Sequence, residues 1–321
     1  MSAGALRRFA SQRLAVLSVL VAFASALSLA GRWHWFADLF AHFVPHYFVA
    51  VSVLFGLHLW LRQFPWAVLG LVVAAGNGAL LSPYLLPRAA MDAGGGTPVR
   101  IFQFNLSRSN PAPLAALGYL RSLPAPPDVA IFLEATPAWT SSLHVMKDDY
   151  PTIAKLPRRD NFGMAVLSRL PGTEVAFRES GQPPVPLIVL TARVDGKAVR
   201  IYAAHPPPPL GGLLSHARNA QLASMAEEIE RSDRRYVIVA GDLNATPWSH
   251  AVGAFFKNAG MRDAQRGFGY LPTWAPPPLS RWLGIPIDLT LVSRDIQVSA
   301  RDAGPWLGSD HWPVLTTVTL R

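Results

Sequence analysis

Polar side chains that could do acid–base or metal chemistry follow apolar runs in the second part of the chain. The stretch GSDHWPV, residues 308–314, places Asp310 beside His311 just before a run that should form the last strand. Such a pair is weak evidence alone, but other runs also end in a polar residue. Apolar strands can hold such residues rigidly at one rim of a sheet. We therefore expect eight side chains from six segments to converge: Asn105, Glu134, His205, Asp242, Asn244, Asp288, Asp310 and His311.

The ligand atoms in this set are mainly carboxylate and amide oxygens. The chain contains no cysteine, which excludes thiol chemistry, disulfides and Cys-ligated zinc. Oxygen ligands suit a hard cation such as Mg²⁺ or Mn²⁺. Glu134 and Asp310 are the best candidates for direct ligands, and such a metal would neutralise charge that develops at phosphorus.

The remaining residues have roles that this chemistry requires. Asp242 could orient or deprotonate a water molecule, and Asn244 could hold a phosphate oxygen or a second metal position. His311 could donate to a non-bridging oxygen or act as a base, with Asp288 fixing its tautomer. These roles would suit chemistry at a metal-bound phosphate.

Short β-rich runs supply the elements that must position these residues. A helix with apolar residues at helical spacing is predicted over 213–231, and another after Thr246 and Pro247, with Thr246 as its cap. The mixture predicts an α+β sandwich with helices on its outer faces, and residues 271–286 should form a loop near the site. The predicted strands are VRIFQFNL, DVAIFLE, GMAVLSR, VPLIVLTARV, VRIYAAH, YVIVAGDLN, IDLTLVS and WPVLTTVTL.

The order and wording of these segments resemble the endonuclease/exonuclease/phosphatase superfamily over about residues 99–321. The motifs are FNLSRSN, FLEA, FGMAVLSR, AAHPPPP, AGDLNATPWS, PIDLTLVS and GSDHWPV. The resemblance implies a four-layer α/β/β/α sandwich and metal-dependent phosphoester hydrolysis by an activated water. It also implies that Asn105 and Glu134 lie in the metal and phosphate corner, and that His205 contacts the phosphate or leaving group. Some relatives have Asp where this chain has Ser107, so the resemblance does not decide whether the site binds one metal ion or two.

The first part of the chain differs in kind from the rest. Uncharged apolar runs near 14–30, 43–61 and 65–87 predict three transmembrane helices in a membrane domain, residues 1–90. A Gly-rich linker, residues 91–98, then precedes a catalytic domain, residues 99–321. Arg7, Arg8 and Arg13 should hold the N-terminus inside a bacterial inner membrane, so the catalytic domain faces the periplasm or cell exterior. If the first apolar run is instead a cleaved signal peptide, the two remaining spans also place the catalytic domain outside.

Several residues also have simpler interpretations. His205 precedes four prolines and could belong to a rigid turn, Asp288 could pair with Arg281, and Arg218 fits a solvated helix face better than a phosphate contact. The Trp and Pro residues of the 271–286 loop could stack on a base, dip into lipid or simply pack.

The sequence as a whole predicts a membrane-anchored, divalent-metal-dependent phosphoesterase. Its substrate could be a phospholipid headgroup, a small phosphodiester or nucleic acid, and membrane lipid would contact its three helices. The net charge of +9 favours anionic partners, but no long Lys/Arg run indicates tight nucleic-acid binding. The alternatives are an extracytoplasmic nuclease on DNA or RNA and an inactive membrane scaffold that retains the fold.

Overall fold

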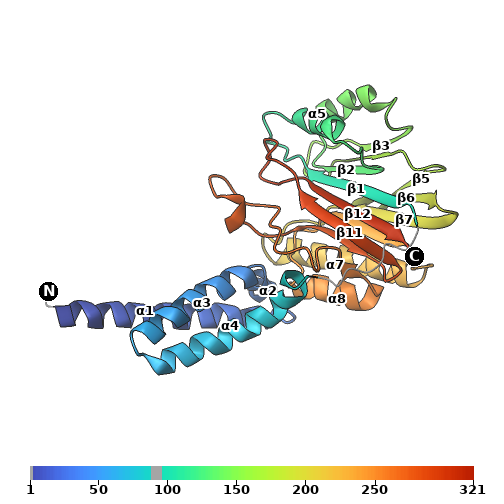
Figure 1. Ribbon diagram of the computed structural model, residues 1–321. Coiled ribbons are helices and arrows are strands. Elements are labelled where there is room, and N and C mark those ends of the chain that lie inside the picture. The colour runs from blue at the N-terminus through green and yellow to red at the C-terminus, as the bar shows by residue number, and fades with distance from the viewer. Residues whose placement is uncertain (1–2, 88–95) are drawn as a thin grey trace.

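Two six-stranded sheets form the centre of the larger part of the molecule (Figure 1). The computed structural model describes residues 3–87 and 96–321, so most of the predicted Gly-rich linker, residues 91–98, lies outside the described residues. The first sheet has the order β11 (Ile296–Ala303), β12 (Val314–Leu320), β1 (Pro98–Asn105), β2 (Val129–Leu133), β4 (Met164–Ser168), β3 (Thr152–Leu156). The second has the order β5 (Glu174–Ser180), β6 (Val185–Val194), β7 (Lys197–Ala204), β8 (Val237–Asp242), β10 (Asp288–Val292), β9 (Arg262–Asp263).

The layers follow from which faces of the strands are apolar. Strands β2, β4, β8 and β10 are buried at every position, as expected when both faces of a strand are covered. One apolar cluster fills the space between the two sheets. A second joins the second sheet to α7 (Gly212–Glu230) and α8 (His250–Ala259), and a third joins the first sheet to α5 (Ala115–Ser122) and α6 (Pro137–Ser141). The fold is therefore mixed α+β, with two stacked sheets and helices on the outer faces.

The cap of helix α8 lies three residues after the predicted cap, Thr246. Ser249 caps the helix, because the Ser249 Oγ accepts from the Val252 N–H at 3.3 Å. Thr246 is not the cap; its Oγ1 instead lies 3.0 Å from Nδ1 of His42, a residue of the N-terminal part. A tertiary contact therefore occupies the side chain that the sequence pattern assigned to the helix end.

Four helices form the N-terminal part: α1 (Ala3–Ser28), α2 (Trp35–Ala41), α3 (Val44–Trp60) and α4 (Phe64–Leu85). Within the described residues, Phe9–Ser28 and Phe64–Leu85 are long and apolar enough to cross a membrane, and α2 with α3 counts as a third span if this pair, bent by 61°, is one unit. Polar side chains join the helices: Asn77 Nδ2 donates to Ser25 Oγ at 2.8 Å, and Ser18 Oγ lies 2.9 Å from His58 Nε2. Such contacts are favourable between helices in an apolar surrounding.

The helices α1, α3 and α4 lie side by side and extend away from the sheets, whereas α2 lies against α7 (Figure 1). Asp38 of α2 pairs with Arg218 of α7 at 2.8 Å, and both side chains are almost completely buried. The prediction that Arg218 lies on a solvated helix face is therefore wrong. The reason is that α2, which is distant in sequence, covers this face of α7.

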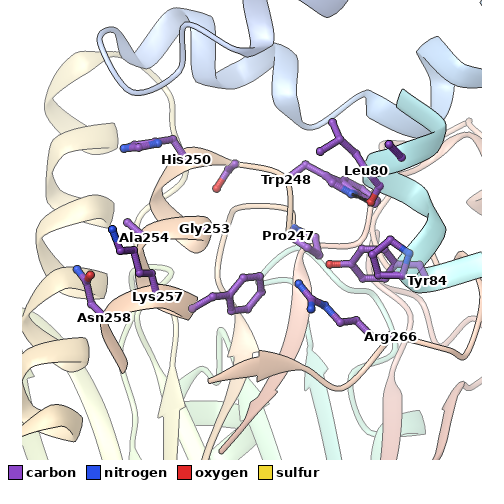
Figure 2. Close-up of a pocket in the computed structure, with 14 residues that line it drawn as sticks. Leu80, Tyr84, Pro247, Trp248, His250, Gly253, Ala254, Lys257, Asn258 and Arg266 are labelled. Atoms are coloured by element: carbon purple, nitrogen blue, oxygen red, sulfur yellow. Dashed lines mark hydrogen bonds between the residues drawn. The ribbon is translucent and has the colours of Figure 1, made fainter. Parts of the chain in front are cut away.

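A second contact joins the end of α4 to the segment that precedes α8 (Figure 2). Trp248 Nε1 donates to the Leu80 carbonyl at 3.2 Å, and the Trp248 and Tyr84 rings are 5.4 Å apart. The hollow beside this contact also has Lys257 and Arg266 in its lining. The N-terminal helices thus contact the sandwich through α4 as well as through α2.

Candidate active site

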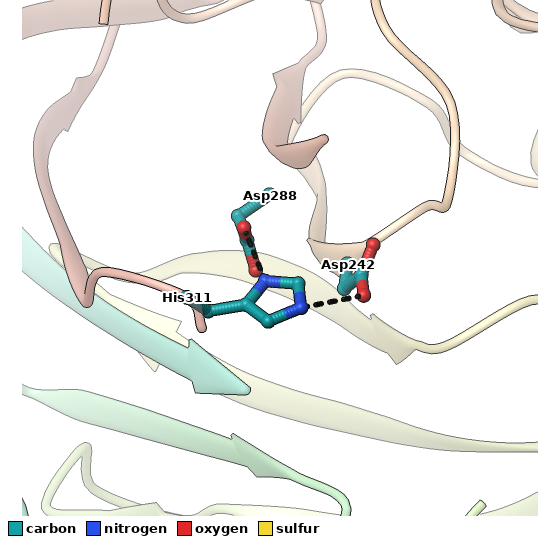
Figure 3. A group of neighbouring side chains, drawn as sticks. All are labelled: Asp242, Asp288 and His311. Atoms are coloured by element: carbon teal, nitrogen blue, oxygen red, sulfur yellow. Dashed lines mark hydrogen bonds and ion pairs between the residues drawn. The ribbon is translucent and has the colours of Figure 1, made fainter. Parts of the chain in front are cut away.

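Two carboxylates flank the imidazole of His311 (Figure 3). His311 Nδ1 donates to Asp288 Oδ2 at 2.8 Å, and Nε2 lies 3.6 Å from Asp242 Oδ2. Asp242 ends β8 and Asp288 begins β10, and the two residues are partners in the antiparallel register of these strands. The sheet therefore fixes the separation of the two acids. The structure supports the predicted Asp288–His311 contact and not the alternative pairing of Asp288 with Arg281.

Glycines on both sides of the site allow close approach of the backbone. A Cβ at Gly241, where φ is 148°, would lie 2.0 Å from the Ala204 carbonyl oxygen on the neighbouring strand β7. A Cβ at Gly308, where φ is 86°, would lie 2.4 Å from Asn110 Oδ1. Only glycine fits these positions without displacement, so the glycines of GDLN and GSDH position the acids that follow them.

The charges of this group shift the pKa of His311. Burial by itself lowers the pKa of this histidine, but the charges of Asp288 and Asp242 and the hydrogen bond to Asp288 outweigh burial and raise it to about 10. Burial also raises the pKa of Asp242. At neutral pH His311 is therefore an imidazolium, which can donate a hydrogen bond to an anion.

A second group lies where β1 and β2 end. Asn105 Nδ2 donates to Asp242 Oδ2 at 3.1 Å and to Glu134 Oε1 at 3.3 Å. Glu134 has φ of 54°, a left-handed conformation that is unfavourable for this residue, and its Oε2 accepts from the Arg108 N–H at 2.9 Å. Asn105 thus links the acid of the first sheet to Asp242 of the second.

His205 and Asn244 complete this side of the site. His205 Nδ1 lies 3.7 Å from Asp242 Oδ2 and Nε2 lies 3.9 Å from Glu134 Oε1; buried Nδ1 has no hydrogen-bond partner within the described residues. Asn244 Nδ2 donates to the Pro206 carbonyl at 2.8 Å, which leaves its second N–H for another acceptor. Both residues therefore present donors close to the carboxylates.

Asp310 belongs to the same cavity as Glu134. Its Oδ2 accepts from Trp274 Nε1 at 2.9 Å, so the predicted 271–286 loop contacts the site through this indole. The cavity has a volume of about 430 Å³. Its polar lining comprises Glu134, Asn161, His205, Asp242, Asn244, Asp310, His311 and His42. Six of the eight predicted residues thus line one cavity. The other two join them by hydrogen bonds, Asp288 to His311 and Asn105 to Glu134 and Asp242.

The donor set fits a divalent cation through its oxygens. The three closest candidate ligands belong to Asp242, Asp288 and His311, whose ligand atoms lie within 4.8 Å of one another. A protonated imidazole has no free lone pair, however, and Nδ1 of His311 is already a hydrogen-bond donor to Asp288. Carboxylate oxygens of Glu134 and Asp310 keep unused lone pairs at the cavity wall and match the ligands that hard cations prefer.

Two supporting residues were not found from the sequence. Arg301 is buried and donates to the Asp288 carbonyl at 2.8 Å and to the hydroxyls of Thr290 and Thr316. Ser309 Oγ donates to the Asn105 carbonyl at 2.8 Å and accepts from the His311 N–H. Ser309 lies inside the GSDH motif, so its position was a usable signal, whereas nothing in the local pattern marks Arg301.

Comparisons with known proteins agree with this geometry. A model of the Endonuclease/Exonuclease/phosphatase family matches residues 102–311. The chain belongs to this family. As a member of the endonuclease/exonuclease/phosphatase family it is a hydrolase of phosphoric esters, and the family's enzymes use divalent metal ions. No curated protein matches the chain by sequence.

Solved structures of the endonuclease/exonuclease/phosphatase fold resemble the sandwich. A Beutenbergia cavernae endonuclease/exonuclease/phosphatase is 20% identical with a TM-score of 0.53, covering 70% of this chain and 72% of that one. The 3'-5' exonuclease NExo from Neisseria meningitidis is 20% identical with a TM-score of 0.53, covering 69% and 99%. A humanized D. rerio TDP2 is 19% identical with a TM-score of 0.54, covering 69% and 99%. At these identities the likeness concerns the fold.

Proposed function

We propose that the protein is a membrane-anchored phosphoesterase that depends on Mg²⁺ or Mn²⁺ and hydrolyses its substrate with an activated water. The observation that carries this proposal is the contact of Asp288, His311 and Asp242 beside a cavity that also has Glu134 and Asp310 in its wall. A phosphoryl group in that cavity would meet hydrogen-bond donors on one side and carboxylates on another. A buried arrangement of this kind suits stabilisation of a charged transition state.

Each residue has a role that follows from its contacts. Glu134 and Asp310 would hold the metal, which when bound neutralises charge on the phosphoryl oxygens. Asp242 accepts a proton from the attacking water, because it lines the cavity and burial raises its pKa. His311 donates Nε2–H to a non-bridging oxygen and Asp288 keeps the ring oriented.

The remaining residues bind and orient. His205 and the free N–H of Asn244 would contact phosphate oxygens. Asn105 belongs to the metal corner, where its amide N–H groups keep the carboxylates of Glu134 and Asp242 in place.

We propose further that residues 1–90 form a membrane domain with three spans, that residues 91–98 are a linker and that residues 99–321 are the catalytic domain. The apolar helices that could cross a membrane support the first point. In a bacterial inner membrane, the arginines near the N-terminus favour a catalytic domain on the periplasmic side.

The proposal is tested with purified full-length protein in detergent and the soluble ester bis(4-nitrophenyl) phosphate. Wild type should release nitrophenol with Mg²⁺ or Mn²⁺, and excess EDTA should stop the reaction. His311→Asn should lower kcat by about 100-fold or more, because it removes the donor to the transition state. His144→Asn, at an exposed position outside the cavity, is the matched control and should keep wild-type kcat.

Other outcomes would favour the alternatives. Turnover of a single-stranded oligonucleotide with no turnover of other phosphodiesters would favour an extracytoplasmic nuclease. Folded wild-type protein that neither binds Mn²⁺ nor cleaves any phosphoester would favour the scaffold.

A further inference from the structure

The N-terminal helices supply part of the wall of the catalytic cavity. Leu39 of α2 lines it, and so do His42 and Phe43 at the bend between α2 and α3. These three residues stand beside the catalytic acids and His311 in the same cavity, although they precede them by about 90 residues or more. The site is therefore built jointly by the catalytic sandwich and by the segment that enters the apolar helices.

Buried polar contacts fix this wall on the sandwich. The Asp38 carboxylate accepts from Arg218 Nη2 at 2.8 Å and from the His250 N–H at 2.7 Å. Arg218 also donates to the Asn244 carbonyl at 3.2 Å, so one guanidinium connects α2 to a residue of the active site. Because both charges of the ion pair are buried, separating α2 from α7 would leave each without its partner.

The remaining cavity wall is largely apolar on the side that adjoins these helices. It includes Leu210, from the loop after β7, and Ile285 and Ile287, from the segment before β10. Leu210 is 76% exposed, so most of its side chain is open to the surroundings at the cavity mouth. Apolar side chains thus continue from the cavity to the molecular surface.

The same loops touch the start of the apolar helices. The Leu283 carbonyl lies 3.0 Å from His46 Nε2 in α3, and a Cβ on Gly212 would lie 3.2 Å from Trp35 Nε1 in α2. Trp282 and Leu283, next to this contact, are also exposed. If α1 and α4 cross the membrane, this side of the cavity lies at the membrane surface, where exposed Trp and Leu side chains are stabilised.

The cavity lining has few groups that would bind a nucleic-acid strand, which carries many negative charges. None of the described residues that line the cavity is Lys or Arg. Sites for nucleic-acid strands combine a cationic groove with stacking side chains, because each nucleotide carries a charged phosphate. The cavity instead pairs one polar corner, sufficient for a single phosphoryl group, with an apolar wall that leads to the membrane-facing helices.

We propose that the substrate is a lipid phosphoester, whose phosphoryl group enters the polar corner while its apolar chain lies along Leu39, Phe43 and Leu210 toward the bilayer. This inference rests on the proposed phosphoesterase activity and adds the substrate class. It also makes the bend between α2 and α3 a determinant of substrate selection. Burial of the chain against these side chains supplies binding free energy that a water-soluble ester lacks.

The test uses two chromogenic diesters that differ only in chain length, ethyl 4-nitrophenyl phosphate and dodecyl 4-nitrophenyl phosphate. Full-length wild type should cleave the dodecyl ester with a kcat/KM at least about tenfold higher than that for the ethyl ester, since ten more methylenes can contact the apolar wall. Leu210→Asp should reduce this preference at least about fivefold. The reason is that a carboxylate on the path of the chain must lose water when the chain binds.

Leu213→Asp is the matched control. Leu213 lies three residues further along, is also 76% exposed, and does not line the cavity. This variant should keep the wild-type preference, which excludes a general effect of a negative charge near the detergent.

Two results would overturn the inference while the proposed function stands: equal kcat/KM for the ethyl and dodecyl esters, or an equal loss of preference in Leu210→Asp and Leu213→Asp. Cleavage of neither ester, with no cleavage of bis(4-nitrophenyl) phosphate, would instead contradict the phosphoesterase itself. Cleavage of an oligonucleotide in preference to the dodecyl ester would replace a lipid by a nucleic acid.

Discussion

At the scale of residues, the site depends on a histidine that keeps its proton. Asp288 and Asp242 approach the two ring nitrogens of His311 from neighbouring strands, and the ring is almost fully buried. Burial opposes the charged form, but two nearby carboxylates favour it more strongly. The protonation state of His311 is therefore a property of the pair of strands that hold the acids.

Titration of the metal-free protein provides a direct check. The His311 pKa should be about 10, against 6.5 for an ordinary histidine, so the ring should stay protonated through neutral pH. Because the folded pKa is the higher one, the stabilisation from this proton is complete below about pH 6.5 and is lost as the pH rises toward 10. Side-chain ¹⁵N shifts of histidine-labelled protein measure this titration.

Asp288→Asn should lower the His311 pKa, because it removes the charge that raises this pKa most. A His311 that loses its proton below pH 7 in wild type, or a pKa unchanged by Asp288→Asn, would contradict this account.

At the scale of elements, α2 is the short helix that attaches the N-terminal part to the active site. Its seven residues could not be stable as an isolated helix. Asp38 provides the attachment through the buried pair with Arg218, and Trp35 packs on Gly212. The helix therefore exists because of its contacts with α7 and the segment before α8.

Asp38→Asn tests how much the buried pair of Asp38 and Arg218 stabilises the protein. The amide keeps an oxygen for the His250 N–H but leaves Arg218 buried without a counter-charge, which should reduce the free energy of unfolding by about 3 to 5 kcal/mol. Denaturant unfolding in detergent measures the change. Asp149→Asn is the control, because its pair with Arg121 is half exposed and should cost less than about 1 kcal/mol. Equal effects of the two substitutions would show that the buried pair does not hold α2.

At the scale of the whole molecule, the apolar helices contact the sandwich through α2 (Figure 1). Residues of both parts line the catalytic cavity. Helices α1, α3 and α4 carry many exposed apolar side chains, among them Phe23, Val49 and Val72. Such a surface is stable in lipid rather than in water.

The orientation of the molecule gives a prediction for cells. With the N-terminal arginines inside and three spans, Arg321 should lie in the periplasm of a Gram-negative bacterium. Alkaline phosphatase fused after Arg321 should be active there, and a green fluorescent protein folded only in the cytoplasm should be dark at the same position. The reverse pattern would refute the proposed topology.

Part of this architecture could be predicted from local sequence. The eight predicted strands all correspond to observed strands, because each is a short apolar run bounded by Gly, Pro or Asp. Strands β3, β5, β9 and β11 were missed. They lie at or near sheet edges and carry polar residues such as Lys155, Arg178 and Arg301, so their pattern does not separate them from loops.

The sequence by itself determined the chemistry of the site, because Asp242 ends, Asp288 begins and His311 precedes a recognisable strand, and their side-chain types limit what they can do. Only the tertiary structure decided that Arg218 is buried and that α2 forms a wall of the cavity. Local periodicity reports whether a residue faces an apolar surface, but not which distant segment covers it. A charged residue on a helix looks solvent-exposed in sequence until its partner, here Asp38 at a separation of 180 residues, is brought to it by the fold.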